Sequence, residues 1–163
     1  MRFHNITKDD MLNGDGLRVV LWVAGCEHQC KNCQNPITWD KNDGLEITED
    51  TIKELCVELN KDYVSGLTLS GGDPLATFNR DETTRIVKRI REEYSDTKSI
   101  WVYTGYNYEE IEELEIMEYI DVLVDGKFVE SLKDVNTPWK GSTNQRVIDI
   151  KKTRETGKIT IWA

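Results

Sequence analysis

Apolar runs rich in β-branched residues alternate along the chain with stretches that have helical periodicity. Short continuous apolar runs are typical of buried strands, whereas apolar residues that recur every three or four positions are typical of one face of a helix. Strands are therefore predicted at residues 18–23, 66–70, 99–104 and 120–125, and helices at residues 48–59 and 81–94. Weaker patterns predict a short helix from Asn107 to Leu114 and strands at residues 146–150 and 159–162.

One cysteine belongs to a predicted helix. In residues 48–59 the inward face carries Ile52, Leu55, Cys56 and Leu59. A cysteine on such a face usually behaves as a small buried hydrophobic residue. We therefore assign Cys56 to the core rather than to a ligand-binding site.

The alternation of strands and helices indicates an α/β fold with a mainly parallel sheet, because parallel strands need a crossover connection that is usually a helix. At 163 residues the chain has the length of a single domain, residues 1–163. A closed barrel of eight such units typically takes about 250 residues. The sequence therefore predicts a partial, open β/α barrel, with its ligand site at the carboxyl ends of the strands.

Four short motifs directly follow the predicted strands. They are the cysteine-rich loop at residues 26–33, Gly71-Gly72-Asp73, Thr104-Gly105-Tyr106 and Asp125-Gly126. Paired glycines let the backbone approach a ligand and expose its N–H groups, although Gly-Gly is equally typical of a plain turn before a helix. Because the carboxyl ends of parallel strands meet at one edge of a sheet, we expect the four motifs to converge on one site.

Charge and composition narrow the choice of partners. The chain has 30 acidic and 21 basic residues and a net charge of −9, which argues against non-specific binding to nucleic acid. The most basic windows, residues 88–91 and 151–154, have acids nearby and fit a solvated surface better. The first residues lack the apolar run of a secretory signal, and no stretch reaches membrane-spanning length. We expect a cytoplasmic protein with reduced thiols and with no nucleic-acid or membrane partner.

Three of the four cysteines lie close together, in the pattern Cys26-x3-Cys30-x2-Cys33. Three such thiols cannot all pair as disulfides, so they indicate a site for zinc or for an iron–sulfur cluster. His28 would complete a Cys3His zinc site, but zinc loops usually bind through two ligand pairs separated by a longer segment. A simple iron–sulfur electron carrier usually has four cysteine ligands. With only three cysteines in the loop, one coordination position of the metal site has no obvious protein ligand.

The cysteine pattern after the first strand and Gly71-Gly72-Asp73 after the second resemble the radical S-adenosylmethionine superfamily. More narrowly, the chain resembles the family of anaerobic ribonucleoside-triphosphate reductase-activating proteins. The matching stretches span nearly the whole chain in order: residues 13–21, 25–30, 70–75, 103–106, 121–126 and 141–146. Many members of the superfamily have Glu where Asp73 stands, and Asp at this position resembles the narrower family. Asn144-Gln145-Arg146 matches that family too, but its sequence indicates no physical role.

The resemblance implies a fold of the radical S-adenosylmethionine type with a [4Fe–4S] cluster and S-adenosylmethionine as cofactors. Cys26, Cys30 and Cys33 would be the catalytic residues and would hold three irons, and the amino and carboxylate groups of S-adenosylmethionine would chelate the fourth. The resemblance also implies further contacts with S-adenosylmethionine. Its methionine amino group would meet Ser70, Gly71, Gly72 and Asp73, and its adenine would be bordered by Asn32, Cys33 and Gln34. Its adenosine would be contacted by Tyr103 to Tyr106, together with Asp121 or Asp125. The tyrosines and acids also have a purely structural explanation, because aromatic residues in strands usually belong to the core and an acidic residue before Gly often forms a turn.

The implied activity is that of a glycyl-radical activase. An electron from the reduced cluster cleaves S-adenosylmethionine to methionine and a 5′-deoxyadenosyl radical. This radical takes a hydrogen from a glycine Cα near the C-terminus of the anaerobic ribonucleoside-triphosphate reductase, and a flavodoxin-like protein is the implied electron donor. The alternative within enzymes is a small radical enzyme that acts on another glycyl-radical enzyme or on a purine-like metabolite. The alternative outside enzymes is a Cys3His zinc-binding module.

Overall fold

The computed structural model describes residues 1–33 and 36–162. Its helices are α1 (Glu49–Leu59), α2 (Arg80–Tyr94), α3 (Tyr108–Ile111) and α4 (Ile150–Thr156). Its strands are β1 (Arg2–Asp10), β2 (Leu17–Val23), β3 (Leu45–Glu46), β4 (Val64–Gly71), β5 (Ser99–Tyr103), β6 (Val122–Asp125) and β7 (Arg146–Asp149). Short 3-10 helices occur at η1 (Pro36–Thr38), η2 (Glu115–Glu118) and η3 (Glu130–Leu132).

The described strands form one mixed sheet in the order β3-β1-β2-β4-β5-β6-β7. The central strands β2, β4, β5 and β6 are parallel, so that Leu21 lies beside Leu69 and Leu69 beside Val102. Toward the edges, β1, β3 and β7 run antiparallel to their neighbours. The predicted α/β architecture with a mainly parallel sheet is therefore confirmed, and the sheet is not a closed barrel.

Predicted and observed elements agree best where the apolar pattern is strongest. The predicted bounds of α1, α2 and the central strands are close to the observed ones. The strand predicted at residues 159–162 was wrong, because this segment makes only an isolated bridge between Ile161 and Ile148. The sequence pattern also missed β1, which is mostly polar and buries only Phe3.

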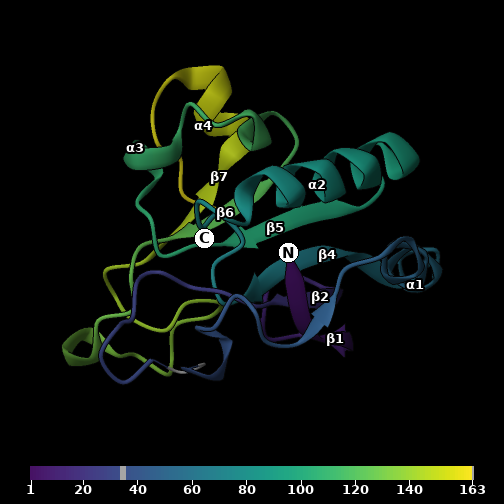
Figure 1. Cartoon of the computed structure of the whole chain (residues 1–163). Coiled ribbons are helices and arrows are strands. Elements are labelled where there is room, and N and C mark those ends of the chain that lie inside the picture. The colour runs from purple at the N-terminus through teal and green to yellow at the C-terminus, as the bar shows by residue number, and fades with distance from the viewer. Residues whose placement is uncertain (34–35, 163) are drawn as a thin grey trace.

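Apolar side chains form a core on each face of the sheet. The larger core lies between the sheet and the helices (Figure 1), where alternating residues of β2, β4 and β5 pack against Leu55 of α1 and Ile90 of α2. Cys56 packs half-buried against this core, as its place on the inward face of the helix predicts. A smaller core on the opposite face consists of Trp101, Val122, Val124 and Val147. The strands supply both cores because successive side chains point to opposite faces.

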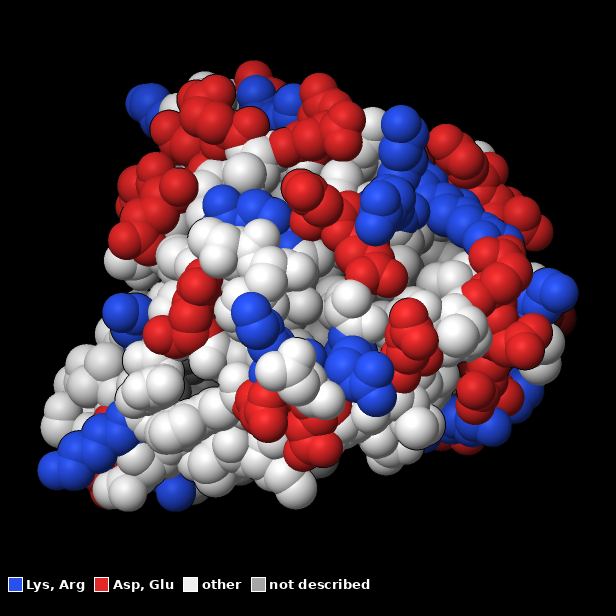
Figure 2. All heavy atoms as spheres, in the orientation of Figure 1, with Lys and Arg blue, Asp and Glu red and all other residues white. Residues whose placement is uncertain are grey.

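Charged side chains are unevenly distributed over the surface. Figure 2 shows acidic and basic groups crowded over the upper and right parts of the molecule, which carry the helices in Figure 1. The lower left part of this face, where loops gather in Figure 1, is mostly uncharged. No helix in the described part of the chain has both the length and the apolar character needed to cross a membrane.

Asp121 joins three elements at the amino end of β6. Its carboxylate accepts hydrogen bonds from Arg91 of α2 and from the backbone N–H of Ile100, each at 2.7 Å, and it lies 3.0 Å from Lys151 of α4. Burial alone raises the pKa of this carboxyl, but the three donors outweigh burial and hold the pKa below its ordinary value. The stabilisation is therefore present above the ordinary pKa and is lost as the pH falls through the lowered one.

We predict that Asp121→Asn lowers the free energy of unfolding by about 1–3 kcal/mol near neutral pH, because the buried network loses its anion. Asp96→Asn is the matched control, since the Asp96 side chain meets the same two cations, Arg91 at 3.8 Å and Lys151 at 3.2 Å, but is 83 % exposed. Urea unfolding measures both variants. Equal effects at the two positions, or an effect of Asp121→Asn that does not shrink in acid, would contradict the prediction.

Candidate functional site

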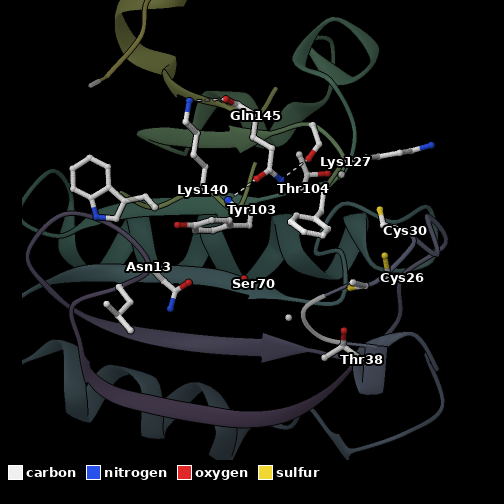
Figure 3. Close-up of a pocket in the computed structure, with 18 of the residues that line it drawn as sticks. Asn13, Cys26, Cys30, Thr38, Ser70, Tyr103, Thr104, Lys127, Lys140 and Gln145 are labelled. Atoms are coloured by element: carbon white, nitrogen blue, oxygen red, sulfur yellow. Dashed lines mark hydrogen bonds between the residues drawn. The ribbon is translucent and has the colours of Figure 1, made fainter. Parts of the chain in front are cut away.

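A pocket of about 640 Å³ lies at the carboxyl ends of the parallel strands. Each of the four motifs that follow these strands contributes to its wall, so the predicted convergence is confirmed. Figure 3 shows Cys26 and Cys30 at one end of the pocket, Tyr103 near its middle and Asn13 toward the other end. Sites for small molecules and cofactors usually measure about 300–1,000 Å³, so the pocket has the size of a cofactor site.

Backbone hydrogen bonds continue the pairing of β2 and β4 beyond the strands and carry it into the cysteine loop. The N–H of Gly72 donates to the carbonyl of Val23 at 2.8 Å, and the N–H of Asp73 donates to the carbonyl of Gly25 at 2.7 Å. The N–H of Gly25 donates in turn to the carbonyl of Thr38 at 2.6 Å. The residue before the first clustered cysteine is thus bonded on both sides, which fixes where the loop begins.

The close approach of these two segments requires glycine at position 71. Gly71 has a φ of +100°, and a Cβ there would lie 2.6 Å from the carbonyl oxygen of Val23. A side chain would therefore force the segments apart. Ser70, Gly71 and Gly72 all line the pocket, so this turn forms part of its wall.

The three clustered thiols border the pocket, and no described cysteine forms a disulfide. Burial raises the pKa of Cys26 to about 11 and also raises the pKa of Cys30, so binding a metal must displace their protons. Among the described residues, no three His, Cys, Asp or Glu side chains converge as ligands of one ion would. An iron–sulfur cluster takes its thiolates on different irons, so separated thiols on one wall fit a cluster better than zinc.

His28 is held by hydrogen bonding and packing. Its Nε2 lies 2.5 Å from a carboxylate oxygen of Asp73, and its ring stands edge-on to Tyr106 with centroids 4.6 Å apart. Asp73 is buried and also accepts hydrogen bonds from the Thr104 hydroxyl and the Gly105 N–H, each at 2.9 Å. The Nε2 atom of His28 is thus engaged by Asp73, which leaves only Nδ1 as a possible metal ligand.

The other predicted contacts differ in how they meet the pocket. Tyr103 lines it, and among the described groups its hydroxyl has no hydrogen-bond partner. Burial raises the pKa of this phenol, so it remains a hydrogen-bond donor at neutral pH. Asn32 is exposed in the cysteine loop, and Gln34 lies outside the described residues.

Three acids that were expected to reach the ligand do not line the pocket. Asp73 faces His28 and the turn after β5, and buried Asp125 accepts hydrogen bonds from Arg146 at 2.5 and 3.1 Å. Asp121 precedes β6 and therefore lies at the opposite edge of the sheet from the strand ends. This position corrects the expectation that Asp121 reaches the adenosine, while Asp73 and Asp125 support the wall from behind.

One wall of the pocket was not predicted. It is the loop after β6, which contributes Lys127, Phe128, Trp139 and Lys140. These residues show no periodic pattern, so sequence reasoning left their segment unassigned. Their only signal is their place after Gly126, because a loop that follows a parallel strand lies at the ligand-binding edge.

Two amide side chains, that of Gln145 (Figure 3) and that of Asn144, explain how this loop is held. The Gln145 carboxamide accepts a hydrogen bond from the N–H of Gly141 and donates one to the carbonyl of Gly126, both at 2.8 Å. Asn144 donates to the carbonyl of Lys127 at 2.8 Å. The amides join the end of the loop to its beginning, which gives the Asn144-Gln145 part of the matching motif a physical role.

The class of protein follows from this site together with a family model. The model is described as a 4Fe-4S single cluster domain and matches residues 12–148. That stretch includes the clustered cysteines and every strand end that forms the pocket. The chain is therefore a protein with a domain for a single [4Fe–4S] cluster.

Curated relatives define the family more narrowly. The anaerobic ribonucleoside-triphosphate reductase-activating protein of Enterobacteria phage T4 is 44% identical over 147 residues, which cover 90% of this chain and 93% of the relative. The protein of the same name from Escherichia coli (strain K12) is 41% identical, with 90% of this chain and 97% of the relative covered. That from Vibrio cholerae serotype O1 is 39% identical, with 89% of this chain and 96% of the relative covered. The chain belongs to the family of anaerobic ribonucleoside-triphosphate reductase-activating proteins.

We predict that Gln145→Ala speeds hydrogen exchange at the amides of Gly141 and Ser142 by about two- to tenfold, because both donate to the lost carboxamide. Thr143→Ala is the matched control, since Thr143 is exposed in the same loop. Exchange followed by NMR or mass spectrometry measures the effect. Unchanged exchange in Gln145→Ala, or equal acceleration in both variants, would contradict the prediction.

Proposed function

We propose that this chain installs a glycyl radical on an anaerobic ribonucleoside-triphosphate reductase. The observation that carries the proposal is the meeting of three clustered thiols and a glycine turn on the wall of one pocket. The name of the relatives states that they activate this reductase, and the same activity accounts for the arrangement of the pocket here. A zinc-binding module would need neither the glycine turn nor the pocket.

Cys26, Cys30 and Cys33 are the proposed ligands of three irons of a [4Fe–4S] cluster, which leaves the fourth iron for S-adenosylmethionine. When bound, the cluster and S-adenosylmethionine supply the electron and the 5′-deoxyadenosyl radical that removes hydrogen from glycine, with methionine as the other product. The task of the chain is to position these groups and to exclude water and oxygen from the pocket.

Residues on the pocket wall have separate proposed tasks. Ser70, Gly71 and Gly72 present backbone groups to the methionine end of S-adenosylmethionine, where carbonyl oxygens suit an amino group. The Tyr103 hydroxyl, which has no protein partner among the described groups, donates a hydrogen bond to what the pocket holds. A buried hydroxyl without a partner is unfavourable, so a ligand that accepts its hydrogen bond gains affinity.

The remaining contacts act at the edge of the site. Asn32 and Gln34 are proposed to border the adenine, and this part of the proposal rests on the resemblance of the cysteine loop to the family. Asp73 and Asp125 act from behind the wall, where each fixes a neighbouring segment through buried hydrogen bonds. Both acids therefore affect ligand binding through the shape of the wall.

We also propose that the sheet is a partial barrel of the radical S-adenosylmethionine type and that residues 1–163 act as one domain. A helix-packed core and a pocket at the strand ends support this arrangement. A glycine on another protein must enter from outside, and an open sheet leaves room for a macromolecular substrate. A flavodoxin-like protein is the proposed electron donor, and thiols that form no disulfide suit a reducing cytoplasm.

We predict that Cys33→Ala abolishes binding of the intact cluster, whereas Cys56→Ala retains it. The second variant should lower the free energy of unfolding by about 1 kcal/mol, because it leaves only a small cavity beside the core. Iron and sulfide analysis after anaerobic reconstitution compares the two. Equal loss of iron would make Cys56 a participant, and full retention in Cys33→Ala would remove the proposed ligand set.

Reduced, reconstituted protein is predicted to convert S-adenosylmethionine to methionine and 5′-deoxyadenosine and to produce a glycyl doublet on the reductase in electron paramagnetic resonance. A reductase with the radical-bearing glycine replaced by alanine is the control and should give no doublet. Cleavage without a doublet on the intact reductase would favour another glycyl-radical enzyme or a purine-like substrate. A colourless, zinc-loaded protein that leaves S-adenosylmethionine intact would contradict the proposal altogether.

A further inference from the structure

Two consecutive side chains within residues 26–30 anchor the cysteine loop to other segments. The Glu27 carboxylate accepts hydrogen bonds from the N–H of Thr77 at 3.1 Å and from the hydroxyl of Tyr106. His28 packs edge-on against the same Tyr106 ring. Most of the other residues between the clustered cysteines are exposed, so these two side chains add side-chain contacts to the backbone hydrogen bonds that hold the loop.

His28 makes the more buried of the two anchors. Its side chain is 5 % exposed, that of Asp73 is 1 % exposed, and the hydrogen bond between them measures 2.5 Å. The Asp73 carboxylate is itself fixed by the N–H of Leu75 at 2.8 Å, the Thr104 hydroxyl at 2.9 Å and the N–H of Gly105 at 2.9 Å. The Asp73 carboxylate that accepts the hydrogen bond from His28 is thus also held by two separate turns.

The shape of the neighbouring turn is matched to the imidazole as well. A Cβ on Gly105 would lie 2.4 Å from a ring carbon of His28, a distance that real Cβ contacts do not reach. Position 105 therefore accepts only glycine while the ring stays in place. Hydrogen bonding and steric fit point independently to the same position for His28, between the clustered cysteines and the turn after β5.

We propose that His28 is a positioning residue, which latches the cysteine loop to the turn after β5 through Asp73. The latch rests on the cluster assigned above to Cys26, Cys30 and Cys33. It keeps the cysteine loop in the position in which its thiols would bind the cluster and leave one iron for S-adenosylmethionine, and His28 itself is not one of the iron ligands. Residues that orient metal ligands in this way typically change affinity or activity by roughly 10–100-fold when they are replaced.

Two amide variants at position 28, which carry the same donor group on side chains of different length, test the latch. Gln at position 28 keeps an N–H donor that reaches Asp73, whereas Asn is one methylene shorter and falls short. His28→Ala removes the donor altogether, and Lys31→Ala, in the same loop and exposed, is the control. The measurements are iron and sulfide content after reconstitution and titration of the electron paramagnetic resonance spectrum of the reduced cluster with S-adenosylmethionine.

All four variants are expected to retain the cluster. His28→Ala and His28→Asn should need roughly 10–100-fold more S-adenosylmethionine for the spectral change, whereas His28→Gln and Lys31→Ala should titrate like the original protein. If His28→Ala does not fold, the comparison of Gln with Asn still decides the result.

Two results would overturn the latch. Titration of the Asn variant like the original protein would show that the reach to Asp73 does not matter. Loss of iron in every His28 variant, with a strong nitrogen coupling from labelled histidine in the original protein, would make His28 a ligand instead. An original protein that binds no cluster would overturn the proposed function as well, so failure of that function is distinguishable from failure of the latch.

Discussion

The parallel pairing of β2 and β4 does not stop where the strands end, and this continuation places the functional loop. Val23 lies opposite Gly71, and the next two N–H groups, from Gly72 and Asp73, still donate to Val23 and Gly25. Backbone hydrogen bonds rather than side-chain contacts therefore set the position of Cys26, the first clustered cysteine. Since a Cβ at Gly71 would meet the backbone of Val23, the arrangement depends on that glycine.

Buried side-chain acceptors extend this order to the other strand ends. The carboxylate of Asp73 joins the cysteine loop to the turn after β5, and the carboxylate of Asp125, bonded to Arg146, fixes the start of the loop after β6. Gln145 then closes that loop onto Gly126. Buried polar groups must be hydrogen-bonded to be tolerated, so each of them specifies one arrangement of irregular backbone. Hydrogen bonds therefore hold the irregular backbone of the pocket wall at these points.

The parts of the fold that were predictable are those with dense apolar patterns. The central strands and long helices follow from runs that bury one or both faces, and the order of the strand ends follows from parallel connection. β1 was missed because its side chains are mostly polar and half-buried, so its pairing depends on neighbours far along the chain. The prediction of a strand around Ile161 was wrong because an apolar pattern alone does not supply a pairing partner, and this segment makes only one bridge.

For the site, the sequence predicted which segments meet but not which way their polar side chains turn. Cys26, Cys30 and Cys33 all border the pocket as expected. Asp73 was expected to face a ligand, yet it turns to His28, because the donors that hold it come from turns distant in the sequence. The loop after β6 has no periodic pattern, and its role in the wall emerges only from hydrogen bonds made by amides near its end.

A three-cysteine cluster with one open iron is tested most directly by Mössbauer spectroscopy of protein reconstituted with isotopically enriched iron. Addition of S-adenosylmethionine is predicted to change the signal of a single iron site and to leave the others unchanged, because only that iron lacks a cysteine ligand. A spectrum in which no single site responds, or a fourth protein ligand found on the cluster, would contradict the assignment of this pocket.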